Sequence, residues 1–495
     1  MKRNAAAERR RLAGVSLRVL SPDGVDDIHL ATLEVLGQAG VFVESDDALD
    51  VLADGGCRVD LATKMVRIPP HVVEDAVRSA PPTLVLHGRD RARDVVVERG
   101  RGVFTSFGEG IFVIDPFSGE RREPRKEDVA ASAAAVDALD ELGICNRALG
   151  AHDVPPQVAA LHTADAILRS TTKHVFLGPQ NGFLAERIVG LQAAILGSAD
   201  AVRERPLVTF TTCPVSPLKL ARDCCEVILA GVRSGVGINV VSMAMAGGSS
   251  PITLAGTLVV HNAEVLAGIT LAQLTERGAP AIYGSVSTGM DLRLASASVG
   301  SPELALITAA VAQLAQHYRL PSFVAGGLGD SKLPDAQSGH EKTLTATFAA
   351  LAGANVIAGA GIIESGLTFD FGQLVMDAEL VGMIRQCAAG IRVDDETLAV
   401  DDICAVGSSG DYLSLEATMR HMREQSQPRY IDRRVHEDWL ALGGTDIHER
   451  SLAEARRILR EYRPEPLPDD VQAQMTRLVA EAEARPERER KRARS

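Results

Sequence analysis

The feature that most constrains this chain is a unit of strand, loop and helix that recurs three times between Pro280 and Gln373. Each copy opens with small and β-branched residues, runs through a Gly- and Ser-rich loop and ends in a long apolar helix. The three strand segments read AIYGSVS, PSFVAGG and ANVIAG. Continuous apolar strands that alternate with helices are typical of a parallel sheet buried on both faces. In a closed parallel barrel, the loops after the strands meet at one end and hold the active site.

The same alternation extends over most of the chain. It predicts eight strands, at 103–107, 144–149, 174–177, 207–211, 238–243, 281–286, 322–325 and 355–358. A helix is expected after each of them. Repeated right-handed βαβ crossovers favour a (β/α)8 TIM barrel, and a doubly wound open sheet is the alternative. We expect an N-terminal α+β cap at 1–100, the barrel at 101–390 and a C-terminal helical extension at 391–495.

Composition narrows the class of protein. The chain has 495 residues, a formal net charge of −13 and no basic stripe interleaved with aromatic residues, so nucleic acid is not an expected partner. Seven cysteines without paired spacing indicate a reducing compartment. No run of 18 apolar residues and no signal peptide are visible, so we expect no membrane span and a cytoplasmic location.

Polar residues just past the strand ends would share one cavity. They are Glu109, Asn146, Arg147, Gln180, Asn181, Thr211, Thr212, Ser287, Asp291, Arg293, Asp330, Lys332, Gln337, His340 and Glu364. Any one of them could instead cap a helix or a loop, and in the same region Asp335 and Ser338, just before a helix, are good cap candidates. The loop after the seventh strand, GLGDSKLPDAQSGHEK, holds more polar groups than capping requires. The sequence therefore predicts chemistry in that loop.

Other motifs are absent or ambiguous. No dinucleotide GxGxxG, P-loop, HExxH or CxxxCxxC is found, so no metal site and no tightly bound cofactor is predicted. Cys213 could be a ligand or a nucleophile, although free cysteine packs more often as a small hydrophobe. His261 and Glu264 are expected to pack against the barrel wall. Most aromatic residues should fill the core, but an aromatic face can also hold a quaternary ammonium group.

Several separated blocks resemble, in order, the trimethylamine methyltransferase family. These blocks are AGGSSPITLAGTLVVHNAEVLAGI (246–269), GSPELALITAAVAQLAQHYRLPSFVAGGLGDSKLPDAQSGHEK (300–342), LAGANVIAGAGIIESG (351–366), DDETLAVDDI (394–403) and EDWLALGG (437–444). The resemblance implies a TIM barrel that moves an N-methyl group to the cobalt of a corrinoid on a separate protein. Some family members carry pyrrolysine, whereas this chain, with standard residues only, is similar to the branch that demethylates quaternary amines such as glycine betaine. A homo-oligomer is also implied.

The resemblance suggests a role for individual residues in and around the polar loop. Asp330, Gln337, His340 and Glu364 are expected to be catalytic. The expected substrate-binding residues are Phe107, Tyr283, Arg293, Phe323 and Lys332: aromatic and acidic groups would hold the cationic head, and Arg293, Gln337 or His340 a carboxylate.

One segment departs from the family pattern. In GDYLSLEATMRHMRE, Asp411 and Ala417 stand where histidines are expected. The alternatives to a corrinoid-dependent methyltransferase are a barrel that only binds methylated amines or serves as a scaffold for a corrinoid partner, and a different barrel enzyme such as a lyase or a zinc methyltransferase.

Overall fold

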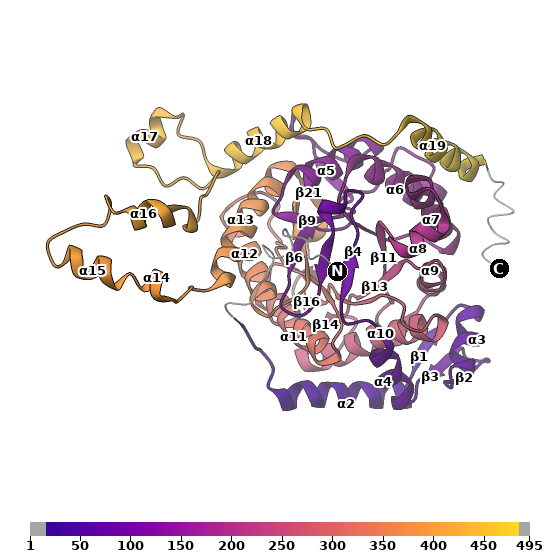
Figure 1. The fold of residues 1–495 in the computed structure, drawn as a ribbon. Coiled ribbons are helices and arrows are strands. Elements are labelled where there is room, and N and C mark those ends of the chain that lie inside the picture. The colour runs from indigo at the N-terminus through magenta and orange to yellow at the C-terminus, as the bar shows by residue number, and fades with distance from the viewer. Residues whose placement is uncertain (1–15, 485–495) are drawn as a thin grey trace.

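The computed structural model describes residues 16–484 and shows a closed barrel of eight parallel strands ringed by helices (Figure 1). In barrel order the strands are β6 (Val103–Ser106), β9 (Leu142–Asn146), β10 (Val175–Leu177), β11 (Val208–Thr212), β13 (Gly237–Ser242), β15 (Ala281–Ser285), β18 (Ser322–Ala325) and β19 (Val356–Ala360). Val356 of β19 pairs with Val103 of β6 and closes the ring. The predicted TIM barrel is confirmed, and the open-sheet alternative is wrong because the barrel has no free edge.

A helix follows each barrel strand. These helices are α5 (Lys126–Ala138), α6 (Ala159–Ser170), α7 (Gly182–Leu196), α9 (Arg222–Arg233), α10 (Leu254–Thr275), α11 (Pro302–Tyr318), α12 (Ala336–Leu351) and α13 (Phe371–Ala389), with the short α8 (Ala199–Glu204) after α7. Side chains of Asn181, Ser301, Asp335 and Asp370 accept the backbone N–H bonds that start four of them. Such N-caps satisfy donors that a helix start otherwise leaves without a partner.

The lower half of the barrel is filled by apolar side chains and closed by a hairpin. Strands β4 (Leu84–Leu86) and β5 (Val95–Val97) form the hairpin, which lies over the centre of the barrel in Figure 1. Their side chains cluster with inward-facing Val103, Phe176 and Phe323 of the barrel. The hairpin backbone also contacts strand starts, since the His87 carbonyl lies 2.9 Å from Nδ1 of His174. The barrel is therefore blind at the amino ends of its strands.

The segment before the barrel combines helices with a small sheet. Its helices are α2 (Pro22–Gln38), α3 (Asp46–Asp54) and α4 (Pro70–Ser79), with the 3-10 turn η1 (Arg91–Arg93), and its strands are β1 (Val41–Val43), β2 (Arg58–Asp60) and β3 (Met65–Arg67). β1 also pairs with β12 (Lys219–Leu220), and α9 begins directly after β12, at Arg222. These elements fit the α+β cap, while the three domain boundaries stay a prediction.

Helix α10 is long and apolar enough to cross a membrane by length and composition. It is the one such helix among residues 16–484, and most of its apolar stretch is buried inside the protein. It packs on β13 and β15 and against α2, α4 and α9. Burial on all sides explains its apolar composition, as in the core helix of a globular protein.

Short strands extend the barrel at the carboxyl ends of its strands. One sheet joins β20 (Ile362–Ile363), β21 (Thr368–Asp370), β7 (Phe112–Ile114) and β8 (Arg121–Arg122), and another joins β14 (Met245–Ala246), β16 (Thr288–Asp291) and β17 (Ser296–Ser298). The 3-10 turns η2 (Pro156–Val158) and η3 (Glu364–Gly366) lie in the same set of connections. These connections lie at the end of the barrel where the active site is expected.

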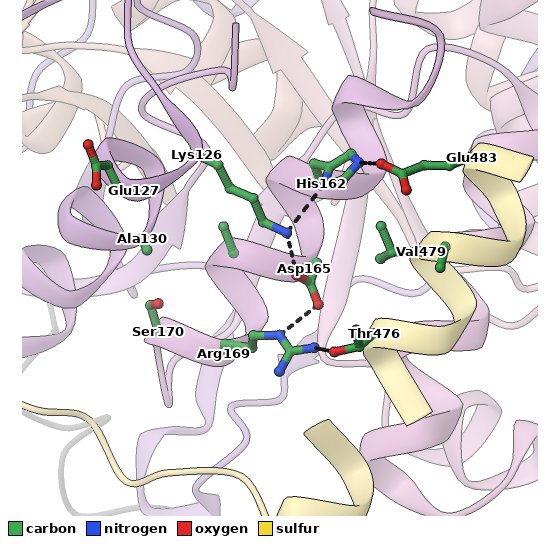
Figure 2. A pocket seen from close by; sticks show the side chains of 12 residues that line it. Lys126, Glu127, Ala130, His162, Asp165, Arg169, Ser170, Thr476, Val479 and Glu483 are labelled. Atoms are coloured by element: carbon green, nitrogen blue, oxygen red, sulfur yellow. Dashed lines mark hydrogen bonds and ion pairs between the residues drawn. The ribbon is translucent and has the colours of Figure 1, made fainter. Parts of the chain in front are cut away.

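After the barrel the chain continues through α14 (Asp395–Leu398), α15 (Val400–Val406), α16 (Glu416–His421), η4 (Met422–Glu424), α17 (His436–Ala441), α18 (Ile447–Glu461) and α19 (Asp469–Ala484). Helix α19 returns to the helical ring and borders a groove of about 570 Å³ with α5 and α6 (Figure 2). Asp165 in this groove pairs with Lys126 and Arg169, each at 2.7 Å, and His162 lies 2.8 Å from Glu483. The contact between His162 and Glu483 joins α19 to α6.

Candidate functional site

The candidate site is the barrel mouth, where the carboxyl ends of the strands meet. Inward-facing positions in the lower barrel are buried, whereas side chains past the ends of β6, β9, β10, β11, β13 and β15 reach solvent. The accessible or partly accessible ones are Phe107, Glu109, Arg147, Gln180, Thr211, Cys213, Met243 and Val286. Glu109, Arg147, Gln180 and Thr211 belong to the set predicted from strand ends. The mouth is thus polar on the β6–β11 side and apolar on the β13–β15 side.

Glu109 and Arg147 form the charged part of the mouth. The two side chains make an ion pair, and Arg147 also donates to the Gly178 carbonyl at 3.1 Å. Arg147 is mostly buried, while the Glu109 side chain is 42% exposed. Both line a cavity of about 260 Å³ together with Gln180. An exposed carboxylate beside a fixed guanidinium can bind a molecule that carries both a cation and an anion.

Cys213 lies in the same mouth. The thiol is accessible to solvent, contrary to the expectation of a small buried residue. Surrounding protein raises its pKa to about 11, and the charge of Arg147 opposes this shift. Cys213 is thus accessible to solvent although protein surrounds it closely. At neutral pH the sulfur is a protonated thiol and a poor nucleophile.

The buried Glu264 of α10 fixes the β11 side of the mouth. Its carboxylate accepts hydrogen bonds from Ser216 at 2.8 Å, Ser242 at 2.6 Å and the Leu218 backbone N–H at 3.0 Å. Burial raises its pKa despite these bonds. The neighbouring His261 is buried as well, and burial lowers its pKa to about 3. The HxxE pair packs against the barrel wall as expected.

The predicted catalytic residue Asp330 lies in a network that ties three loops together. Its carboxylate accepts backbone N–H bonds from Val299 and Gly300, both at 3.0 Å, and the Ser365 hydroxyl at 2.8 Å. Glu341 in turn accepts the Asp330 backbone N–H at 2.7 Å. The oxygens of Asp330 therefore already have partners within the protein, which is the geometry of a loop clamp.

A second network lies beneath this loop. The ammonium group of Lys342 is buried and donates to the carbonyls of Gly327 at 2.6 Å and Gly359 at 3.1 Å. It also pairs with buried Asp377 at 3.0 Å, whose pKa is raised by burial. The polar density that made the loop conspicuous in the sequence thus holds the ends of β18 and β19 in place.

The other predicted polar residues are dispersed around the outside of this loop. Glu364 pairs with Arg121 at 2.9 Å, and the guanidinium of Arg121 lies over the Phe112 ring. Gln337 donates to Glu341 at 2.7 Å, and Lys332 donates to the Asp330 carbonyl at 2.8 Å.

Two predicted side chains point to solvent. His340 is exposed and has no polar partner among residues 16–484. Arg293 is 87% exposed and pairs with Asp291, its neighbour on the β16–β17 hairpin. The structure does not bring these residues together around one cavity, and their predicted roles remain untested.

The three predicted aromatic residues occupy different layers. Tyr283 faces outward from β15, is fully buried and donates a hydrogen bond to Asn262 of α10 at 2.7 Å. Phe323 faces inward but is 4% exposed and stacks on Phe176, with 5.5 Å between ring centroids. Phe107 is partly exposed at the mouth, directly before Gly108 and Glu109. Of the three, only Phe107 can present a ring face to a ligand in the mouth.

Sequence reasoning missed an apolar rim beside the mouth. Its exposed side chains are Val215, Met243, Ile252, Leu292 and Leu294. The last two lie on the β16–β17 hairpin, and Gly247 brings Ile252 and Leu292 together. The signal available in the sequence was the pair of leucines on either side of Arg293, in an otherwise polar turn. No cluster of three or more His, Cys, Asp or Glu side chains arranged for a metal ion is found in the described part of the chain.

Closed parallel barrels with an accessible polar mouth form a large class of enzymes that work on small molecules at that end. Comparison with known proteins identifies the group within this class. The family model described as "Trimethylamine methyltransferase (MTTB)" matches residues 3–486, so the chain belongs to the trimethylamine methyltransferase family. The resemblance seen in the sequence blocks is confirmed.

The relatives cover nearly the whole chain. A trimethylamine methyltransferase of Desulfitobacterium hafniense strain DCB-2 is 48% identical over 96% of this chain and 95% of its own length. A glycine betaine methyltransferase of Desulfitobacterium hafniense strain Y51 is 33% identical over 94% and 96%. A solved monomethylamine methyltransferase of Methanosarcina barkeri has 14% identity and a TM-score of 0.48, over 92% of this chain and 96% of that chain. The chain is an enzyme of the methylamine methyltransferase group.

Proposed function

We propose that this enzyme transfers an N-methyl group from a quaternary or tertiary methylated amine, of the betaine type, to the Co(I) of a corrinoid carried by a separate protein. Family membership supports the methyl transfer, and the relative that acts on glycine betaine supports the substrate type. The observation that carries the proposal is the Glu109–Arg147 pair beside Phe107 in an accessible mouth. A betaine can exchange partners with this pair, its ammonium taking Glu109 and Phe107 and its carboxylate taking Arg147.

The chemistry asks little acid or base work of the protein. The N–C bond of the ammonium group breaks, its electron pair stays on nitrogen, and the methyl carbon bonds to the nucleophile. The corrinoid cobalt supplies that nucleophile. A quaternary amine leaves as a neutral tertiary amine, so no proton is needed. The protein contributes position and electrostatics.

The charge of the substrate also limits how tightly the mouth should hold it. Positive charge on nitrogen is lost as the reaction proceeds, so a site that binds only the cation strongly would stabilise the substrate more than the transition state. Arg147 next to Glu109 moderates the negative field. We propose that Asp330, Gln337 and Glu364, predicted as catalytic, instead shape the loops that frame the mouth, through the bonds described above.

The apolar rim gives a place for the corrinoid protein. Met243 is 47% exposed and Leu294 is 73% exposed, beside an otherwise polar opening. Exposed apolar groups next to an active site are typical of docking surfaces. All seven cysteines are free thiols, which fits the reducing, cytoplasmic setting that a Co(I) nucleophile requires.

The test is a reaction of the enzyme with a reduced corrinoid protein and a panel of betaines and methylamines, followed by the cobalt absorption spectrum. We expect methylation of cobalt with at least one betaine and formation of the demethylated amine in equal amount. Calorimetry on the same panel runs in parallel. Binding without methylation would favour the scaffold alternative, and neither binding nor methylation across the panel would refute the proposal.

A further inference from the structure

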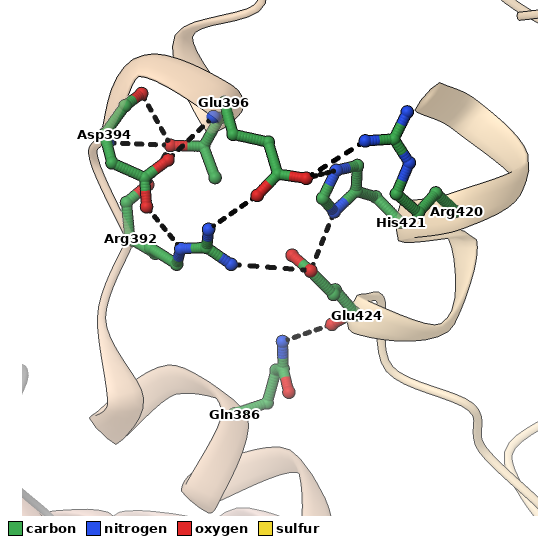
Figure 3. Close-up of polar contacts among 8 residues, drawn as sticks. Gln386, Arg392, Asp394, Glu396, Arg420, His421 and Glu424 are labelled. Carbon is green, nitrogen blue, oxygen red and sulfur yellow. Dashed lines mark hydrogen bonds and ion pairs between the residues drawn. The ribbon is translucent and has the colours of Figure 1, made fainter. Parts of the chain in front are cut away.

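Two clusters of charged side chains outside the barrel mouth are matched within the protein. After α13, Glu396 pairs with Arg392 at 2.9 Å and with Arg420 at 3.2 Å (Figure 3). The groove beside α19 is of the same kind, because its lysine and its arginine share one carboxylate (Figure 2). Opposite charges in contact cancel much of the field that a ligand would meet.

A third cluster lines a groove between α2, α4 and α11. This cavity has a volume of about 520 Å³, within the range of small-molecule sites. The lining side chains that carry or can take up charge are His29, Glu74, Arg78, His317 and Arg319. Because α11 ends just before β18 begins, the groove lies at the amino ends of the barrel strands. It is therefore separate from the barrel mouth.

The charges of this groove are not matched. Among residues 16–484, Arg78, Arg319 and Glu74 have no ion-pair partner. Two guanidinium groups thus share the groove with the carboxylate of Glu74, before either imidazole takes up a proton. This is a local excess of positive charge on a chain whose formal net charge is −13. An excess of this sign in a cavity attracts anions.

The backbone of Arg319 supports a role for its side chain. Arg319 ends α11 in the left-handed region, with φ 57° and ψ 32°. Glycine is the usual residue at such a position, because a side chain there costs free energy. The Arg319 side chain is exposed and has no polar partner in the described part of the chain. No contact within the protein offsets the cost, which points to a ligand.

We propose that this groove binds the phosphate group of a small organic phosphate, with the guanidinium groups of Arg78 and Arg319 and the imidazoles of His29 and His317 as donors. Guanidinium groups bind phosphate oxygens through two parallel hydrogen bonds. A phosphate monoester carries nearly two negative charges and three acceptor oxygens near neutral pH. It can therefore use donors from all three helices, whereas a carboxylate offers two oxygens and one charge.

The rest of the lining selects the kind of phosphate. Val77, Ala80 and Pro82 give the groove an apolar side, which inorganic phosphate would leave uncovered. Glu74 repels a second negative group. A monoester whose organic part is small, apolar and uncharged fits both features.

A chain of hydrogen bonds sets the state of His29 before a ligand binds. The hydroxyl of Thr32 donates to the Ile28 carbonyl at 2.7 Å and so accepts from the side-chain nitrogen of Asn262 at 2.9 Å. The same nitrogen donates to the Tyr318 hydroxyl at 2.7 Å, which leaves Tyr318 to donate to Nδ1 of His29 at 3.0 Å. An accepting Nδ1 belongs to the neutral imidazole. Burial also lowers the pKa of His29.

A bound phosphate should reverse this preference. The charges that act on His29 come from all three helices: the positive charge of His317 lowers its pKa further, and Asp26 and Glu74 raise it. A phosphate next to the imidazole adds negative charge and favours the protonated form. Binding should therefore take up protons near pH 7, and the affinity should fall as the pH rises and the imidazole loses its proton.

The first test is titration calorimetry of the full chain at pH 7, with phenyl phosphate and, separately, with inorganic phosphate. Phenyl phosphate should bind with a dissociation constant of about 1 mM or lower. Inorganic phosphate should bind at least about fivefold more weakly, since it leaves the apolar side uncovered. Equal affinities would support the anion site but refute an organic phosphate as its ligand. No binding of either compound would overturn the proposal.

Arg319→Gly tests the site with a variant that keeps the fold. Glycine suits the left-handed position, so the melting temperature should be unchanged or higher. The affinity for phenyl phosphate should fall at least about tenfold, as expected for a lost hydrogen bond to a charged group. Lys64→Gly is the matched control, because Lys64 has a φ of 55° and lies outside the groove. Wild-type affinity in Arg319→Gly, or an equal loss in Lys64→Gly, would contradict the proposal.

His29→Gln tests the link to protons. Calorimetry in two buffers of different ionisation enthalpy measures the protons taken up at pH 7, where a phosphate monoester is already mostly dianionic. The wild type should take up protons, and its affinity should fall at least about threefold between pH 7 and pH 8.5. His29→Gln should take up fewer protons, and an unchanged uptake would refute the part assigned to His29. None of these measurements uses an amine or a corrinoid, so they can fail without affecting the proposed methyl transfer.

Discussion

The loop after β18 and the barrel mouth near β6, β9 and β11 are both rich in polar side chains, yet they differ in what those side chains contact. In the loop, the oxygens of Asp330 and Glu341 are occupied by backbone N–H groups and hydroxyls of the protein. In the mouth, Glu109 keeps an accessible carboxylate and Cys213 an accessible thiol. Groups whose bonds are complete build a frame, whereas groups with free capacity can bind a ligand.

The largest effect is expected at Glu109. Glu109→Gln removes the carboxylate that we propose faces the substrate cation and should lower kcat/KM for a betaine by about 100- to 1000-fold, because the lost interaction joins two opposite charges. Steady-state kinetics with the corrinoid protein measure this. Glu123→Gln is the control, since Glu123 borders the same cavity with a 71% exposed side chain. An equal loss of kcat/KM in both variants would show that the effect does not depend on the Glu109–Arg147 ion pair.

At Asp330 we expect the opposite result, a loss of stability without a loss of substrate binding. In Asp330→Asn, an NH2 group replaces a carboxylate oxygen that accepts backbone N–H bonds, so two donors face each other. The unfolding free energy should fall by about 1.5–3 kcal/mol, the range for hydrogen bonds to a charged group. Urea unfolding measures the loss. The folded variant should keep its KM for the amine. A fall in kcat above about 100-fold with stability unchanged would instead make Asp330 a catalytic group.

The surroundings of Cys213 in the mouth can be tested by the pH dependence of its reaction with an alkylating agent. Its raised pKa of about 11 keeps the thiol protonated at pH 8, and the thiolate fraction rises about tenfold per pH unit up to the pKa. Alkylation by iodoacetamide, followed by mass spectrometry, should therefore be slow at pH 7 to 8 and steepen above it. Exposed Cys404 of α15 is the internal reference. A Cys213 that reacts as fast as Cys404 at pH 7 would show an ordinary thiol.

The smallest effect is expected at Arg293. Its guanidinium is solvated and pairs with Asp291 two residues away, so Arg293→Ala should change kcat/KM by less than about twofold, as is usual for exposed pairs. The control is Arg147→Ala, which should cause a large loss. A comparable loss of kcat/KM in both variants would instead support the predicted role of Arg293 in substrate binding.

The fold could be predicted from the sequence because strand and helix patterns are local. All eight strands were located to within a few residues, since apolar runs of small and β-branched residues alternate with helices throughout. The direction of a side chain on such a strand could not be predicted. In AIYGS both faces are buried, so the pattern does not show that Ile282 faces inward and Tyr283 outward.

The candidate site was predictable in its place but not in its members. The rule that strand ends converge selected Glu109 and Arg147 as part of a larger set. It could not show that the denser loop at Asp330 satisfies its own hydrogen bonds, because those bonds come from Val299, Gly300 and Ser365, elsewhere in the chain. A high density of polar residues in a sequence does not show whether they bond to one another, as at Asp330, or are free to bind a ligand.

The β4–β5 hairpin gives the barrel a single opening, and this has a kinetic consequence. With the corrinoid protein docked at the mouth as proposed, we expect it to cover the route by which an amine reaches Glu109. The order of binding is then compulsory, with the amine first and the protein second, and the demethylated product is released last. Initial-rate patterns with both substrates varied should accordingly show a sequential, ordered mechanism.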